Sequence, residues 1–143
     1  MNDTAIGIDI DGRKVIIAAL RKEDGEIKNF TGNYKPILLE DDNKAPNVIL
    51  FRNTLFATFD SYSPSLILIK TRNPKGKGSY APSPISFKVE GIIQTYEKCA
   101  VRMVAPQTIA AYFKKNTATS APTFGYQSDA FNLAYHYLDS SKK

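Results

Sequence analysis

The expected fold is decided by Ile6-Gly7-Ile8-Asp9-Ile10-Asp11-Gly12, a stretch near the start of the chain. Its isoleucines alternate with small or polar residues, which is the pattern of a strand that buries one face. The dipeptide Asp11-Gly12 is typical of a two-residue type I′ hairpin turn. The sequence therefore predicts that a strand over residues 4–10 turns directly into a second strand over 13–20.

The remainder of the chain predicts a third strand and then alternating helices and strands. A second turn at Asp24-Gly25 leads to a strand over 26–30, and residues 31–44 are expected to form a loop. Helical spacing covers 48–59, 85–96, 106–113 and 128–138, and short apolar strands cover 66–70 and 100–104. Ser63-Pro64 is expected to end the first helix, Pro106 to open the third, and Ser128 to cap the last.

This order of elements predicts one α/β domain over residues 1–143. Three hairpin-linked strands followed by crossover units form a mixed sheet with helices on both faces. The expected sheet has five strands in the spatial order 3-2-1-4-5, with strand 66–70 parallel beside strand 4–10. This is the order of the ribonuclease H plan.

Composition narrows the classes of protein that the chain can belong to. It has 143 residues, 43% of them apolar, and no apolar run long enough to cross a bilayer, so we expect no membrane span. A single cysteine, Cys99, excludes an internal disulfide and a cysteine-based zinc site. Together with the absence of a signal-peptide pattern at the start, these features favour a cytoplasmic location.

The charge is unevenly distributed along the chain. The net charge is +5, and residues 61–118 contain nine bases but only two acids, Glu90 and Glu97. A basic half is typical of a nucleic-acid footprint. A lysine-rich surface that serves only solubility is the alternative.

Two resemblances follow from particular motifs. The stretch Ile6–Gly12 and the closing stretch 128–134, Ser-Asp-Ala-Phe-Asn-Leu-Ala, resemble the first strand and last helix of ribonuclease H-like enzymes such as RuvC-type Holliday-junction resolvases. The segments 75–78 and 85–94, with Ala130-Phe131 and Ala134-Tyr135, resemble a bacterial domain-of-unknown-function family, number 3010. That family is regarded as ribonuclease H-like, so the resemblance implies the fold and brings no activity with it.

The RuvC resemblance implies a carboxylate site for Mg²⁺ or Mn²⁺. It assigns the metal to Asp9 on the first strand and Asp129 on the last helix. Glu90 is a third candidate catalytic acid because it lies on the polar side of its expected helix, opposite Ile92 and Ile93. Paired divalent ions in such a site activate a water molecule and stabilise the leaving oxygen. Each acid has a plainer interpretation, since Asp9 can pair with a lysine and Asp129 can complement the helix dipole.

One departure from the RuvC pattern puts this site in doubt. RuvC-type enzymes place a glutamate at the end of the fourth strand, where this chain has Lys70. Either Glu90 compensates for the missing carboxylate, or Lys70 pairs with Asp9 and the site holds no metal. A protonated lysine cannot ligate a cation.

The segment 70–77 is the candidate nucleic-acid-binding region. Its candidate contacts are Lys70, Arg72, Lys75 and Lys77, with glycine amides between the lysines. Two functions remain open at this point: a nucleic-acid-binding protein with a weak or eroded metal-dependent nuclease site, and a non-catalytic binding module. The sequence is compatible with a homodimer and does not decide the oligomeric state.

Overall fold

A computed structural model describes residues 3–32, 35–72 and 83–140 of the chain. One mixed sheet forms its centre, with the strand order β3-β2-β1-β5-β6. Its strands are β1 (Asp3–Asp11), β2 (Lys14–Glu23), β3 (Glu26–Asn29), β4 (Ile37–Leu38), β5 (Leu66–Lys70) and β6 (Ala100–Val104). The first three strands are antiparallel neighbours, whereas β5 is parallel to both β1 and β6. The predicted order 3-2-1-4-5 is therefore confirmed, with β5 and β6 as the expected fourth and fifth strands.

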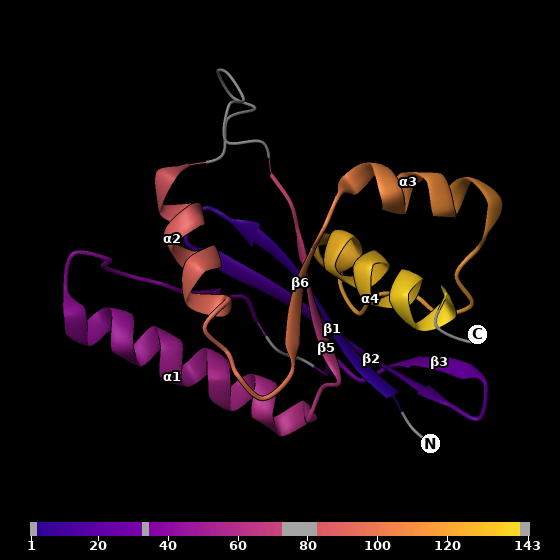
Figure 1. The fold of residues 1–143 in the computed structure, drawn as a ribbon, viewed down its shortest axis with the longest axis horizontal. Helices are drawn as coiled ribbons and strands as arrows, with labels where there is room; N and C mark the ends of the chain where they lie inside the picture. Colours follow the sequence, from indigo (N-terminus) through magenta and orange to yellow (C-terminus); the bar gives the residue numbers. More distant parts are fainter. Residues whose placement is uncertain (1–2, 33–34, 73–82, 141–143) are drawn as a thin grey trace.

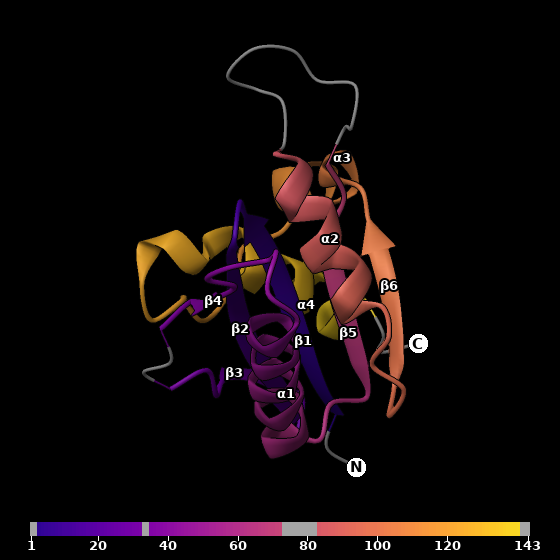
Figure 2. The ribbon, with the colours of Figure 1, turned by 90° about the vertical axis from the view of Figure 1, so that its left-hand side faces the viewer.

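Four α-helices cover the two faces of the sheet, and they are α1 (Ala45–Tyr62), α2 (Pro84–Ile93), α3 (Pro106–Lys115) and α4 (Ser128–Ser140). Helices α1 and α2 lie on one face, and α3 and α4 lie on the other (Figure 1). Turning the molecule by 90° places α1 and α2 in front of the strands (Figure 2). The helices on both faces agree with the expected ribonuclease H plan.

The alternation of residues in β1 divides the core into two halves. Ile6, Ile8 and Ile10 point into the larger half, which packs against α1 and α2. Ala5 points into the other half, which packs against α4. This is the division that the period-2 pattern of the sequence predicted.

The first hairpin turn lies one residue later than expected. Asp11 pairs with Lys14, so the two-residue loop consists of Gly12 and Arg13 instead of Asp11 and Gly12. Only Gly12 has a positive φ, of 58°, which fits a type II′ turn and not the predicted type I′ turn. The second turn is as predicted, since Asp24 and Gly25 both have positive φ.

Three other details differ from the sequence-based prediction. The expected loop 31–44 contains β4, which pairs with β2. The first helix begins at Ala45, earlier than its apolar spacing indicated, because Pro46 fits the first turn where no amide donor is needed. Ser128 does not act as an N-cap, since its backbone is already helical and a 3₁₀ turn over Gly125–Gln127 leads into α4.

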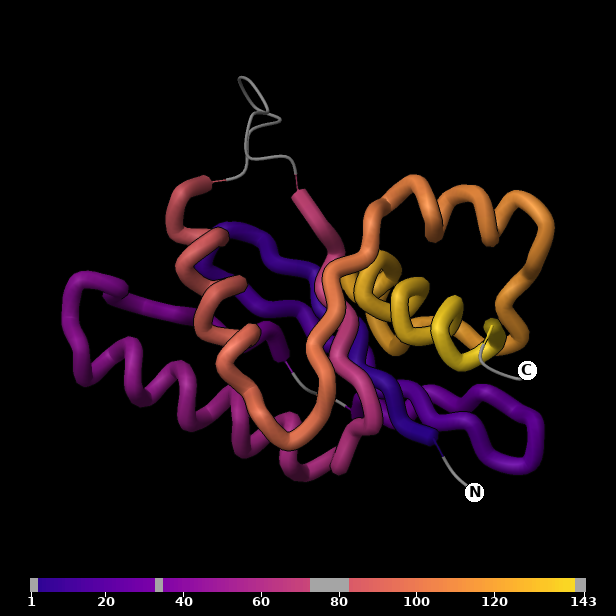
Figure 3. Tube along the Cα trace, in the orientation of Figure 1, coloured from indigo at the N-terminus to yellow at the C-terminus, as the bar shows by residue number. Residues whose placement is uncertain are grey.

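A glycine allows α4 to approach the sheet very closely. A Cβ atom added to Gly7 would lie 1.8 Å from the backbone oxygen of Ala130. Both Ala130 and Ala134, on the facing side of α4, are fully buried. Helix α4 contacts β1, β2 and β5, and the tube view shows it on the side of the strands away from α1 and α2 (Figure 3). This contact determines where the first turn of α4 lies relative to the end of β1.

Candidate functional site

The candidate site lies at the carboxyl end of β1 and β5. The parallel register pairs Ile8 with Ile69, so Asp9 and Lys70 follow directly on neighbouring strands. Asp9 shares the face of β1 that carries Gly7, which is the face covered by α4. The pairing of two apolar strands therefore brings a carboxylate and an ammonium group together.

The third member of the site comes from the first turn of α4. Lys70 Nζ donates a hydrogen bond to Asp129 Oδ2 at 2.7 Å and lies 4.0 Å from Asp9 Oδ1. Asp9 and Asp129, the two acids to which the RuvC resemblance assigns a metal, therefore both lie within reach of one ammonium group. The Lys70 side chain is 30% exposed and that of Asp129 is 54% exposed, so the site opens to solvent.

The surroundings shift the protonation of the two more buried members. Burial raises the pKa of Asp9 above its usual value, and the nearby Asp129 and Asp11 carboxylates raise it further, although Lys70 and Arg72 oppose this. The pKa of Lys70 is raised, because its hydrogen bond to Asp129 and the charges of the two aspartates outweigh the cost of burial. Lys70 is therefore fully protonated at neutral pH.

Glu90 does not join these acids. Its Oε1 accepts a hydrogen bond from Arg72 Nη2 at 2.5 Å, and both side chains are largely buried. The Arg72 guanidinium also lies over the Phe87 ring, 4.5 Å from its centroid. Arg72 therefore joins the end of β5 to α2, and Glu90 compensates for this arginine instead of the missing carboxylate.

The donors in this site do not fit a divalent metal ion. In the described ranges 3–32, 35–72 and 83–140, no group of three or more His, Cys, Asp or Glu side chains is placed to hold one. A cation between Asp9 and Asp129 would also meet the Lys70 ammonium, and like unit charges 4 Å apart repel by about 4 kcal/mol at an effective dielectric constant near 20. Of the two alternatives that the sequence left open, this geometry agrees with pairing of Lys70.

The basic half of the sequence is partly neutralised by ion pairs. Besides Lys70 and Arg72, Lys88 pairs with Asp42 and Lys98 pairs with Asp60. Lys75 and Lys77 lie outside the described residues. In the part of the chain that the structure describes, the basic residues of 61–118 without an ion pair are Arg102, Lys114 and Lys115.

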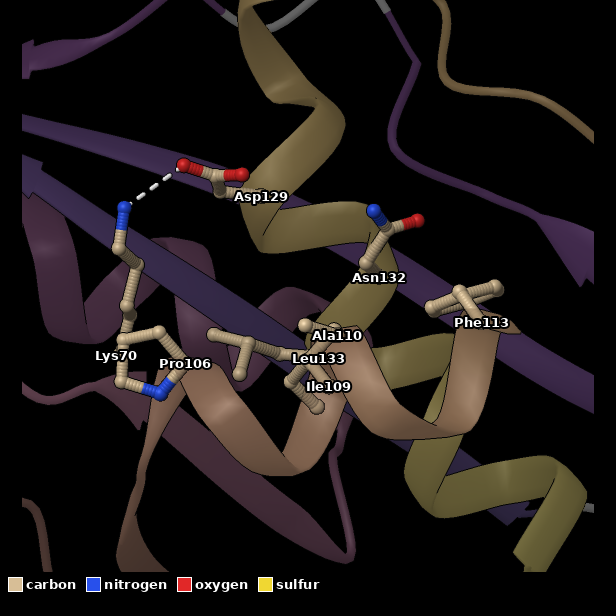
Figure 4. A pocket seen from close by; sticks show the side chains of 8 residues that line it. All are labelled: Lys70, Pro106, Ile109, Ala110, Phe113, Asp129, Asn132 and Leu133. Carbon is tan, nitrogen blue, oxygen red and sulfur yellow. Dashed lines mark hydrogen bonds and ion pairs between the residues drawn. The ribbon is translucent and has the colours of Figure 1, made fainter. Parts of the chain in front are cut away.

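A pocket beside the site was not expected from the sequence. It lies between α3 and α4, has a volume of about 270 Å³, and reaches Lys70 and Asp129 at one end (Figure 4). Asn132 and Phe113 also line it. The spacing of Asp129 and Asn132, three residues apart on one helix, was the only sequence signal for this pocket.

Comparison with solved structures defines the class of fold. The structure resembles Thermus thermophilus RuvC, both alone and in complex with a Holliday junction substrate, with a TM-score of 0.72 and 10% identity over 97% of this chain and 95% of that chain in each case. It resembles the fowlpox virus Holliday junction resolvase with a TM-score of 0.54 and 12% identity, over 96% and 99% of the two chains. The chain therefore has a RuvC-like ribonuclease H fold.

The sequence family agrees with the resemblance noted from the motifs. Residues 4–137 match the model of DUF3010, described as a protein of unknown function. The chain belongs to the DUF3010 family. No curated protein matches its sequence. Among the described residues, no helix is long and apolar enough to cross a membrane.

Proposed function

We propose that this protein binds nucleic acid without cleaving it, on a ribonuclease H-like scaffold in which the Lys70 ammonium takes the place of a divalent cation. The observation that carries the proposal is the position of Lys70 Nζ, 2.7 Å from Asp129 Oδ2 and 4.0 Å from Asp9 Oδ1. The ammonium supplies the positive charge that holds the two acids together. It activates no water molecule, because a protonated lysine has no lone pair and carries no bound hydroxide.

The nucleic-acid part of the proposal is supported by charge and by the fold. The chain has a net charge of +5. Lys114 and Lys115, without an ion pair in the described part of the chain, end α3 and follow Phe113, which lines the pocket. A cationic end also suits the helix dipole, so these two lysines have a structural interpretation as well. A structural neighbour is known bound to a Holliday junction, which makes branched DNA the first ligand to test.

Binding is tested by fluorescence anisotropy with a four-way junction, a duplex and a single strand at several salt concentrations. We expect the affinity to fall as salt rises, because each phosphate contact releases a counterion. The double variants Lys114→Ala/Lys115→Ala and Lys75→Ala/Lys77→Ala should each lower the salt slope by about two. A Lys44→Ala variant, which removes a lysine on the α1 side, serves as the control. No binding at low salt to any of the three ligands would refute the proposal.

Cleavage is tested separately with Mg²⁺ and Mn²⁺. We expect no cleavage of the same ligands by the natural protein, and Lys70→Glu should bind Mn²⁺ more tightly in calorimetry because it replaces the opposing charge by a carboxylate. Lys70→Gln is the matched control, since it removes the positive charge without adding a carboxylate. Brisk cleavage by the natural protein that Lys70→Glu does not improve would show that the lysine does not block the site.

A further inference from the structure

The pocket between α3 and α4 combines an apolar wall with a polar edge. Its apolar wall is formed by Pro106, Ile109, Ala110, Phe113 and Leu133. Its polar edge is formed by Lys70, Asp129 and Asn132. Figure 4 shows the Lys70–Asp129 pair at one end of the pocket, Phe113 at the other end, and Asn132 between them. Apolar walls with a few convergent polar groups are typical of a site for a small organic ring system.

The polar edge has unused hydrogen-bonding capacity. Lys70 bonds to Asp129 through Oδ2, and within residues 3–32, 35–72 and 83–140 neither Asp129 Oδ1 nor the Asn132 amide has a hydrogen-bond partner. The carboxylate oxygen is an acceptor, and the amide offers both a donor and an acceptor. Because the two residues are three apart on α4, these groups lie on the same side of the helix.

The local charge decides which ligands suit the pocket. Two carboxylates, Asp9 and Asp129, surround the single Lys70 ammonium, so the polar end is negative overall when both acids are ionised. A free phosphate or carboxylate inside the pocket would be repelled. A neutral ring that donates an N–H to Asp129 Oδ1 would be favoured.

The apolar end suits a flat ring. The Phe113 ring meets Tyr112 edge-on, with an interplanar angle of 89°, and meets Tyr135 at a tilt of 44°. Neither contact is a parallel stack. Aromatic side chains of this kind stack unpaired bases in many proteins that bind single strands.

From these observations we infer that the pocket binds one unstacked nucleobase that carries an exocyclic amino group, namely adenine, cytosine or guanine. The amino group donates to Asp129 Oδ1, the Asn132 amide pairs with the ring edge, and the ring packs against Phe113 and Leu133. Carboxylates and amides are the side chains that recognise amino-bearing bases elsewhere. This inference rests on the proposed function where the base belongs to a bound strand, whereas a free nucleoside has the same recognition chemistry.

The first experiment uses free nucleosides and the natural protein. Adenosine, cytidine, guanosine and uridine are titrated into ¹⁵N-labelled protein while amide chemical shifts are recorded. We expect saturable shifts in α3 and α4 with the three amino-bearing nucleosides, and affinity for uridine lower by about tenfold or more. Asp129→Ala, which removes the acceptor of the amino group, should abolish this preference. Asn132→Leu should weaken binding of the amino-bearing nucleosides, and Phe113→Leu should weaken all four titrations. Asn47→Leu, the same change on α1 at the opposite face, is the matched control.

The second experiment separates the two sources of the base. Oligo-dA, oligo-dC and oligo-dT of equal length are compared by anisotropy in the natural protein and in Asp129→Ala. A preference for oligo-dA and oligo-dC that Asp129→Ala removes supports a base within a strand. Preferential nucleoside binding with no strand binding at any salt concentration supports a free-nucleoside site and refutes the proposed function. If strands bind but neither probe distinguishes amino-bearing bases, or Asp129→Ala keeps the preference, the pocket inference is overturned and the proposed function stands.

Discussion

Lys70 and Arg72 lie two residues apart at the end of one strand, yet they join different halves of the molecule. Lys70 contacts Asp9 and Asp129 on the α4 side and is 30% exposed. Arg72 contacts Glu90 on α2, lies over Phe87 and is only 10% exposed. A buried pair that loses one partner leaves an uncompensated charge, whereas a solvated pair contributes little to stability. We therefore expect Arg72 to act mainly on the free energy of unfolding and Lys70 mainly on the chemistry of the site.

The largest expected effect tests the close approach of α4 to β1, which places Asp129 near Lys70. Gly7→Ala places a methyl group 1.8 Å from the Ala130 carbonyl oxygen, so α4 must move away from β1. We expect a loss of about 3 kcal/mol or more in the free energy of unfolding, measured by urea denaturation. In the folded fraction, displacement of Asp129 should separate it from Lys70.

The control for Gly7→Ala is Gly91→Ala in α2. Apart from its chain neighbours and the adjacent backbone of α2, no heavy atom lies within 4 Å of a Cβ added to Gly91. Alanine is the better helix former, so this variant should be more stable by about 0.5–1 kcal/mol. Equal losses in the two glycine variants would contradict the close approach of α4 to β1.

The next effect concerns the buried cation. Arg72→Met removes the partner of Glu90 and the contact with the Phe87 ring. We expect a loss of about 3 kcal/mol, measured by urea denaturation at neutral pH. The double variant Arg72→Met/Glu90→Met should recover part of that loss, because it also removes the unpaired carboxylate. If Arg72→Met lost no more free energy of unfolding than Lys70→Met, the expected difference between the two cations would be wrong.

The more exposed cation should matter less to stability. Lys70→Met leaves Asp9 and Asp129 without the ammonium between them, and we expect a loss of about 1 kcal/mol or less at neutral pH. Loss of the ammonium also removes an influence that lowers the pKa of Asp9. The Asp9 carboxyl should therefore titrate at higher pH in Lys70→Met than in the natural protein, which carbon-detected NMR measures directly. An unchanged titration would place Lys70 away from Asp9 in solution.

The smallest expected effect is a pH dependence at Asp9. The folded-state pKa of Asp9 is raised above 3.8, mainly by burial, so the folded protein binds this proton more tightly than the unfolded chain does. The contribution of Asp9 to stability is therefore most favourable below about pH 3.8 and falls as pH rises through the folded-state pKa. The Asp9→Asn variant lacks this fall in stability, because asparagine does not titrate.

Urea denaturation of both proteins between pH 3 and pH 8 measures the effect. The stability of Asp9→Asn relative to the natural protein should increase across this range and level off above the folded-state pKa of Asp9. A relative stability of Asp9→Asn that falls with pH would mean that pairing with Lys70 outweighs burial.

The order of elements and the two-sided burial of β1 followed from the sequence alone. Alternation of apolar residues and the spacing of Gly, Pro and Asp report local backbone preferences, which act over a few residues. They therefore predicted the strand order, the two helical layers and the second hairpin turn. They missed the type of the first turn. A two-residue loop of Asp11-Gly12 and one of Gly12-Arg13 both contain Gly12, and the pairing of β1 with β2 determines which of them forms.

The composition of the site was decided by tertiary structure. The sequence named Asp9, Asp129 and Lys70, but only the parallel register of β1 with β5 and the close approach of α4 at Gly7 bring them within reach of one another. Local patterns also could not reveal that Arg72 takes Glu90 away from these acids, or that α3 and α4 enclose a pocket beside them. The physical reason is distance along the chain. Such contacts join residues as far apart as Gly7 and Ala130, which are separated by 123 positions, and only packing of the whole chain determines which charges meet.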